Sequence, residues 1–349
     1  MSKKLQKIST LLCVAATISV GSAQGAELNF ASWGGAYQNA IRESWLKPFS
    51  KETGIKVNED TEPQVAKIRA MIDTQTVAWD VVTENGARLA KGVKLGVFEK
   101  ITPDMVNQDH VIPGARHDYG VPSEIFSTLV GYSLKEFPNG KLQPKTFADF
   151  WNVEKFPGKR TMQDEPSTVI EAALIADGVA PTDVYKVLAT PAGVDRAMKQ
   201  IEKIKPYVAV WWKNGAEPVN ALASGEVVMA LGWNGRFQAG IDSKIPIKMS
   251  WDNVVNQVGY FALVKGAPNR DSGIKFLNYM IQPKAQAEFS KYIAYGPTTE
   301  KAIALIDEAR IERLPSTPER LKAALFLDSE FWEQNGATLT ERYNQVRAR

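Results

Sequence analysis

Short apolar runs alternate with amphipathic helical stretches along this chain, and this alternation limits its fold more than any other feature. Residues 227–233 and 259–264 are nearly continuous apolar runs, which is typical of strands buried on both faces. Between the strand-like segments 27–32 and 55–57, apolar residues recur every four positions and predict one helical stripe: Tyr37, Ile41, Trp45 and Phe49. Strands that alternate with helices predict an α/β protein with largely parallel sheets.

The length of the chain predicts two domains. It has 349 residues, and single hydrophobic cores stop growing beyond roughly 250–300 residues. The sequence contains no internal repeat and no Gly/Ser-rich linker. We therefore expect short strand-like connections between the domains, near residues 121–127 and 256–260.

The first 26 residues predict export. Lys3, Lys4 and Lys7 form a basic start, residues 8–20 an apolar run, and residues 21–26 a segment of mostly small side chains. This order is that of a secretory signal peptide. The apolar run is shorter than the roughly 20 residues that a membrane span needs. We expect residues 1–26 to be removed.

Removal of residues 1–26 changes the cysteine content and the net charge of the chain. Cys13 is the only cysteine, so the remaining chain has no thiol for disulfide, redox or zinc-thiolate chemistry. Three lysines leave with the segment, which lowers the formal net charge from +3 to 0. A balanced charge argues against a nucleic-acid or membrane partner.

Sequence motifs of catalysis are missing. The chain has no G-x-S-x-G elbow, no Walker phosphate loop and no H-E-x-x-H metal motif. His110 and His117 are the only histidines, and no third ligand stands beside them, so we interpret them as loop residues. The sequence predicts neither an enzyme, nor a metal site, nor a bound cofactor.

Aromatic and glycine residues stand at predicted strand ends, where ligands of α/β sheets bind. Trp33, Trp211-Trp212 and Trp233 could stack on apolar stems or face an ammonium group, or could simply cover the edge of the core. Gly34-Gly35 could offer backbone N–H groups to a carboxylate, or only form a tight turn. Asp164-Glu165 could meet a cationic ligand, or only begin a helix at Pro166.

Several segments, in this order along the chain, resemble family 1 solute-binding proteins. The resemblance is greatest to the periplasmic putrescine/spermidine-binding receptors of ATP-binding-cassette (ABC) importers. The segments are Trp33-Gly34-Gly35, 50–57, 79–82, 224–236, 262–269 and 276–298, which includes Gly296-Pro297-Thr298.

The resemblance implies a periplasmic-binding-protein type II fold, with two α/β lobes, a ligand cleft between them and two or more interlobe crossings. It implies that residues 27–124 and 259–302 form lobe 1, and residues 125–258 and 303–349 form lobe 2. Such receptors work in the periplasm, commonly as monomers, and deliver their ligand to a permease in the inner membrane. The ligand-binding residues that the resemblance implies are Trp33, Gly34, Gly35, Tyr37, Asn85, Glu165, Trp212, Trp233, Asn234 and Tyr260.

Two positions depart from the polyamine-binding pattern. Gly259 stands where those relatives carry an acid, and Thr168 replaces a second carboxylate one turn after Glu165. Loss of a buried carboxylate partner costs a bound cation on the order of 2–5 kcal/mol. This departure favours a ligand with a single amine and a carboxylate at its other end. Lys213, Arg236 or the Gly34-Gly35 turn could bind that carboxylate.

The sequence therefore predicts a receptor for a small amine-containing solute, such as putrescine, spermidine or a related amine. The alternative is a receptor for an amino acid such as 4-aminobutyrate. A ferric-iron receptor and an exported enzyme are further alternatives.

Overall fold

A computed structural model of the protein describes residues 25–348. The predicted signal peptide, residues 1–26, lies outside the described residues except for its last two positions. Within the described part, no helix is both long enough and apolar enough to cross a membrane.

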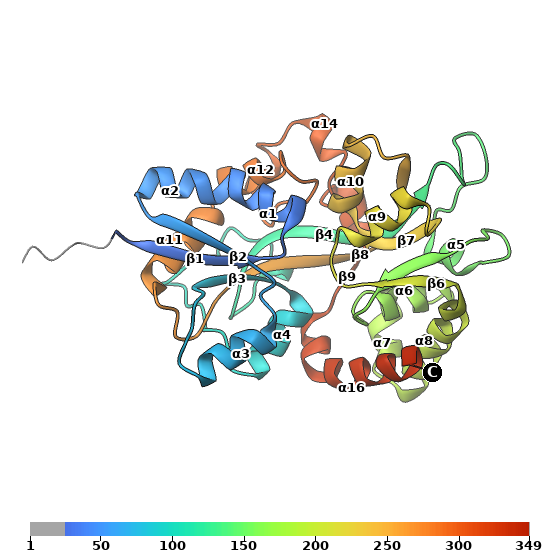
Figure 1. The fold of residues 1–349 in the computed structure, drawn as a ribbon, viewed down its shortest axis with the longest axis horizontal. Coiled ribbons are helices and arrows are strands. Elements are labelled where there is room, and N and C mark those ends of the chain that lie inside the picture. The colour runs from blue at the N-terminus through green and yellow to red at the C-terminus, as the bar shows by residue number, and fades with distance from the viewer. Residues whose placement is uncertain (1–24, 349) are drawn as a thin grey trace, which may run out of the picture.

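The described chain alternates strands and helices, as the apolar pattern predicts (Figure 1). The strands are β1 (Glu27–Ser32), β2 (Lys56–Thr61), β3 (Val81–Asn85), β4 (Val121–Ser133), β5 (Arg160–Gln163), β6 (Val208–Trp212), β7 (Met229–Trp233), β8 (Ile247–Leu263) and β9 (Leu325–Phe326). The helices of the N-terminal half are α1 (Gly35–Ile41), α2 (Lys47–Thr53), α3 (Val65–Asp73), α4 (Gly86–Lys94), α5 (Phe147–Trp151) and α6 (Val169–Ala176), with a π-helical turn at Arg42–Leu46. Those that follow are α7 (Val184–Leu188), α8 (Pro191–Ile204), α9 (Glu217–Ser224), α10 (Asn234–Asp242), α11 (Arg270–Met280), α12 (Pro283–Phe289), α13 (Glu300–Ile303), α14 (Glu308–Ile311), α15 (Pro318–Ala323) and α16 (Ser329–Ala348).

The strands form one mixed sheet in the order β2-β1-β3-β8-β4-β7-β5-β6, with β9 paired to β8. The outer strands are parallel: β1 pairs with β2 and β3, and β5 pairs with β6 and β7. In the centre, β8 is antiparallel to β3 and β4, and β4 is antiparallel to β7. The α/β prediction is confirmed, but the expectation of largely parallel sheets is wrong for the central strands.

Two α/β lobes lie at the two ends of this sheet (Figure 1). The core of the first lobe contains Phe30, Trp45 and Phe276, together with residues of β3 and the end of β8. The core of the second lobe contains Phe150 and Tyr343, together with residues of β5 and α6. Since β4 and β8 supply residues to both cores, they are the crossings between the lobes. The residue limits given above for each lobe stay a prediction.

Candidate functional site

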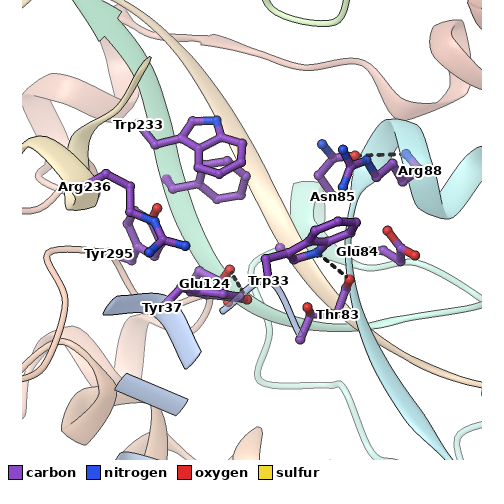
Figure 2. Close-up of a pocket in the computed structure, with 12 residues that line it drawn as sticks. Trp33, Tyr37, Thr83, Glu84, Asn85, Arg88, Glu124, Trp233, Arg236 and Tyr295 are labelled. Carbon is purple, nitrogen blue, oxygen red and sulfur yellow. Dashed lines mark hydrogen bonds between the residues drawn. The ribbon is translucent and has the colours of Figure 1, made fainter. Parts of the chain in front are cut away.

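A pocket lies where the crossing strands meet the ends of β1, β3 and β7 (Figure 2). Its volume is about 430 Å³, including the part that is open to solvent. Both lobes contribute to its wall, so the pocket lies in the cleft between them. Its lining residues are Trp33, Tyr37, Thr83, Glu84, Asn85, Arg88, Glu124, Phe126, Trp233, Arg236, Gly259 and Tyr295.

Tryptophans at two strand ends form part of the pocket wall. Trp33 follows β1, and its Nε1 donates a hydrogen bond to the Thr83 carbonyl oxygen at 2.9 Å. Trp233 ends β7 and meets the ring of Phe126 edge to face, at 5.7 Å between centroids. The Nε1 of Trp233 is buried and has no hydrogen-bond partner in residues 25–348. These two rings lie where their strand-end positions predict.

A carboxylate of β4 fills the space beside Gly259. Glu124 pairs with Gly259 across the ladder, and a Cβ atom on Gly259 would lie 2.1 Å from Glu124 Oε1. The hydroxyl of Tyr37 donates to that Oε1 at 2.8 Å, while Oε2 is buried with no partner among the described residues. Gly259 carries no acid itself, but Glu124 of the next strand places a carboxylate beside it.

Burial changes the protonation of this carboxylate. It raises the pKa of Glu124 to about 7, although the hydrogen bond from Tyr37 acts in the opposite direction. Near neutral pH, Glu124 can thus be neutral without a ligand and ionised beside a cation.

Arg236 of α10 brings a buried positive charge to the pocket. Only 6% of the residue is exposed, and within residues 25–348 no carboxylate lies within ion-pair distance of its guanidinium. Its Nη2 donates to the Gly34 carbonyl oxygen at 3.5 Å, and its Nε has no partner there. Gly35 permits this approach, since it has a φ of 59° and a Cβ atom on it would lie 3.1 Å from Nη1.

Arg88 of α4 also lines the pocket, but its charge is paired. Its Nη2 and Nε donate to Glu165 Oε1 at 2.7 and 3.2 Å. The guanidinium carbon lies 4.0 Å from the centroid of the Trp33 ring. Asn85 begins this helix, and its Oδ1 accepts the Arg88 backbone N–H at 2.9 Å. Glu165 is thus a partner of Arg88 and is not among the lining residues of the pocket, and its direct contact with a ligand stays a prediction.

Glu84 points to the other face of the sheet. It pairs with Tyr260, whereas its neighbour Asn85 pairs with Gly259, and successive side chains of a strand point in opposite directions. In Figure 2 its carboxylate lies on the far side of Trp33 from Glu124. Burial raises the pKa of Glu84 to about 8, so this group is largely neutral at neutral pH.

Three more predicted site residues lie behind the pocket wall. Trp212 is fully buried, donates to the Leu231 carbonyl oxygen at 2.9 Å and supports the ring of Trp233. Asn234 accepts the backbone N–H of Ser127 and donates to the Ala294 carbonyl oxygen. Tyr260 packs against His117 on the opposite face of the sheet. In this structure they support the wall, and their contact with a ligand stays a prediction.

The residues predicted to bind the anionic end of the ligand lie in different places. Arg236 lines the pocket, and Gly34 and Gly35 contact it without lining the pocket themselves. Lys213 is exposed, and its Nζ lies 3.7 Å from Asp164 Oδ2. Thr168, fully buried with a φ of 71°, begins α6 away from the lining. In residues 25–348, no group of three or more His, Cys, Asp or Glu side chains could hold a metal ion.

The sequence analysis missed Thr83, Glu84, Arg88, Glu124, Phe126 and Tyr295 among the lining residues. One signal was available for Glu124, which is a single acid within the otherwise buried strand β4. A charged residue in such a strand requires a local reason. The other positions become neighbours only through the pairing of strands distant in sequence.

Comparison with known proteins identifies the family. The model of the bacterial extracellular solute-binding proteins matches residues 44–318. The chain belongs to this family. A γ-aminobutyric acid-binding protein of Pseudomonas aeruginosa is 36% identical over 333 residues, covering 95% of this chain and 94% of the relative. The spermidine/putrescine-binding periplasmic protein of Salmonella typhimurium is 25% identical and covers 85% and 86%.

Solved structures of relatives agree with the two-lobed fold. The periplasmic binding protein MotA of A. tumefaciens B6, in complex with glucopine, superposes with a TM-score of 0.87 at 32% identity and covers 92% of this chain and 99% of MotA. The protein AttC of Agrobacterium tumefaciens C58, in an open unliganded conformation, superposes with a TM-score of 0.67 at 29% identity and covers 92% of this chain and 99% of AttC.

These findings confirm the predicted periplasmic-binding-protein type II fold and the resemblance to polyamine receptors, which are among the relatives. The protein is a solute-binding component of the ABC-importer class, whose members bind small molecules and deliver them to a permease.

Proposed function

We propose that this protein is an exported receptor that binds a small solute with one ammonium group and one carboxylate, with 4-aminobutyrate as the compound to test first. It works in the periplasm and delivers this solute to an inner-membrane permease. The observation that carries the proposal is that, within residues 25–348, the buried cation Arg236 has no carboxylate partner and Glu124 has a buried oxygen without a donor, both in the same pocket.

Both groups gain a partner from such a ligand. A buried charge without a partner is costly, and truncation of one partner of a buried pair typically costs 2–5 kcal/mol. The ligand carboxylate accepts hydrogen bonds from Arg236 and from the free Nε1 of Trp233. The ligand ammonium group donates to Glu124 Oε2, the oxygen that Tyr37 leaves free.

The middle of the ligand meets aromatic walls. Trp33, Phe126, Trp233 and Tyr295 line the same small pocket, and their apolar faces suit a short methylene chain.

The charges also argue against a diamine. A diamine needs a charged carboxylate at each end, but of the two lining acids burial raises the pKa of Glu84 to about 8 and keeps it largely neutral, which leaves Glu124. Arg236 would repel the second ammonium group. The higher identity to a γ-aminobutyric acid-binding protein than to a spermidine/putrescine-binding protein supports the same ligand class.

The test is isothermal titration calorimetry of the purified protein with 4-aminobutyrate and with putrescine. We expect binding of 4-aminobutyrate and not of putrescine. Arg236→Gln should weaken the binding of 4-aminobutyrate at least thirtyfold, which corresponds to about 2 kcal/mol.

Lys213→Gln is the matched control, since Lys213 is an exposed cation outside the pocket. It should leave the affinity unchanged. Tight binding of putrescine, or equal losses in the two variants, would contradict the proposal.

A further inference from the structure

We propose that Arg88 and Glu165 form a latch that favours the closed arrangement of the two lobes, and that Glu165 affects ligand affinity only through this closure. The latch concerns the movement around the pocket and rests on the proposed function only where ligand binding is used to measure it.

The two residues belong to different lobes. Arg88 lies on α4, beside β3 in the first lobe, and Glu165 follows β5 in the second lobe. Their side chains meet through two hydrogen bonds to one carboxylate oxygen, at 2.7 and 3.2 Å. Among the described residues, Arg88 has no other carboxylate within ion-pair distance. Separation of the lobes must therefore break this pair.

Local structure holds each partner in place. The Arg88 guanidinium lies over Trp33 at 4.0 Å, and Trp33 is itself fixed by its hydrogen bond to Thr83. On the other lobe, the neighbouring Asp164 is held by an ion pair with Arg347 and a backbone hydrogen bond to Trp212. Fixed side chains lose less conformational entropy when they pair, so such a pair contributes more than a pair of free surface side chains.

Arg88 and Glu165 differ in how deeply they are buried. We interpret this difference as that of a contact which forms when the lobes close. The side chain of Arg88 is 14% exposed and that of Glu165 is 39% exposed. Arg88 thus lies inside the cleft, while Glu165 reaches it from the rim. Burial alone would lower the pKa of Arg88, but the charge of Glu165 beside it outweighs burial and raises that pKa. Arg88 therefore keeps its positive charge at neutral pH.

A second arginine crosses the cleft in the opposite direction. Arg236 belongs to α10 of the second lobe and donates to the Gly34 carbonyl oxygen of the first lobe. Arg236 lacks a carboxylate partner, so its contribution to closure depends on the ligand. Arg88 already has Glu165, so its contribution does not. The latch should therefore act with or without a ligand.

The test measures the distance between the lobes and the ligand kinetics in the same variants. Spin labels on cysteines introduced at Lys51 of α2 and Lys203 of α8, both exposed, report the interlobe distance. In the ligand-free protein, Glu165→Gln should decrease the population with the short distance. In the unlabelled protein, it should raise the dissociation rate of 4-aminobutyrate about three- to tenfold, the range for a partly exposed, well-held ion pair, with little change in the association rate.

A double-mutant cycle separates closure from direct contact. With the latch already broken by Arg88→Gln, the further change Glu165→Gln should have little effect on distance or dissociation rate. Glu202→Gln, an exposed acid on α8 outside the ion pairs of the described residues, is the matched control and should behave as the wild type.

Two outcomes would overturn the latch. One is an interlobe distance distribution of the ligand-free protein that is the same in the wild type and in Glu165→Gln. The other is an equal loss of affinity from Glu165→Gln with and without Arg88, which is the result expected for a direct ligand contact. Failure of 4-aminobutyrate to bind the wild type contradicts the proposed function alone, since the ligand-free distances still test the latch.

Discussion

At the scale of single residues, Arg88 and Arg236 lie in the same pocket wall, but only Arg88 has a carboxylate partner. The type of residue therefore does not determine the charge that a ligand meets. That charge depends on whether another lobe or strand supplies a counter-ion, as Glu165 does for Arg88. Of the four charged side chains that line the pocket, Arg236 has no carboxylate partner in residues 25–348, and Glu124 and Glu84 have buried oxygens without a donor there.

The protonation of Glu124 predicts that ligand affinity depends on pH. Burial raises its pKa to about 7, and an ammonium group binds the ionised form, so ligand binding releases a proton from the protonated fraction. Affinity for 4-aminobutyrate should increase about tenfold from pH 6 to pH 8 and change little above that. Titration calorimetry at several pH values measures it.

Glu124→Gln is the control for this pH dependence. Its amide cannot ionise, so the variant should bind weakly, with nearly the same affinity at pH 6 and pH 8. The facing phenol of Tyr37 does not titrate in this range, since burial raises its pKa well above 10. Glu84, which also lines the pocket and whose pKa burial raises to about 8, is present in both proteins, so the difference between them reports Glu124. An equally steep pH dependence in Glu124→Gln would exclude Glu124 as its source.

The sequence was sufficient for some residues of the site and not for others. Trp33 and Trp233 could be predicted, because each follows an apolar run and strand ends are where such sites form. Glu124 could not be assigned a role, because its position beside Gly259 depends on the register between β4 and β8. At position 259 the sequence indicated a missing acid, and only the pairing reveals the acid from the neighbouring strand.

At the scale of secondary-structure elements, helix α16 packs against α8 in the second lobe and against α4 in the first (Figure 1). Its Trp332 donates an Nε1 hydrogen bond to Glu171 Oε1 of α6 at 2.7 Å. Tyr185 donates to the same oxygen at 3.0 Å, and Glu171 Oε2 has no partner in residues 25–348. Burial raises the pKa of Glu171 to about 7 against these hydrogen bonds. The docking of α16 therefore depends on a poorly satisfied carboxyl group.

Removal of the indole donor should destabilise the protein. Trp332→Phe keeps an aromatic ring but leaves buried Glu171 with one donor fewer, and we expect a loss of about 1–3 kcal/mol in the free energy of unfolding at pH 7.5. Urea denaturation measures this loss.

Trp151→Phe is the matched comparison, since Trp151 Nε1 donates to a neutral backbone oxygen, that of Gln200, at 3.0 Å. It should cost less, about 0.5–1.5 kcal/mol. Equal losses in the two variants would mean that the carboxyl group of Glu171 has no special part in docking α16.

The apolar runs predicted the existence of the elements better than their directions. Residues 227–233 contain β7, and residues 259–264 contain the end of β8. However, β8 is antiparallel to β3 and β4, and its first half mixes buried residues with exposed ones such as Lys248 and Asp252. Apolar content indicates burial, whereas direction depends on the connections between elements. The sequence pattern therefore could not reveal a mixed sheet.

At the scale of the whole molecule, the two lobes share their central strands. β4 has 13 residues and β8 has 17, and their paired register runs from Val121 and Phe261 in one lobe to Ser133 and Ile247 in the other. Neither lobe has a sheet that is independent of these strands. Unfolding of one lobe removes the hydrogen-bonded partners of strands that continue into the other, so the lobes should unfold together.

This shared sheet predicts how a ligand changes thermal stability. A ligand held by Arg236 of one lobe and enclosed by Trp33 of the other binds only the folded pair. At 100 times its dissociation constant, it adds about 2.7 kcal/mol to the free energy of unfolding. Because the lobes unfold together, scanning calorimetry with 4-aminobutyrate should show one transition that moves upward as a whole by several degrees. Arg236→Gln should keep the single transition and lose most of the shift. Two transitions, of which the ligand moves only one, would mean that the crossing strands do not couple the lobes.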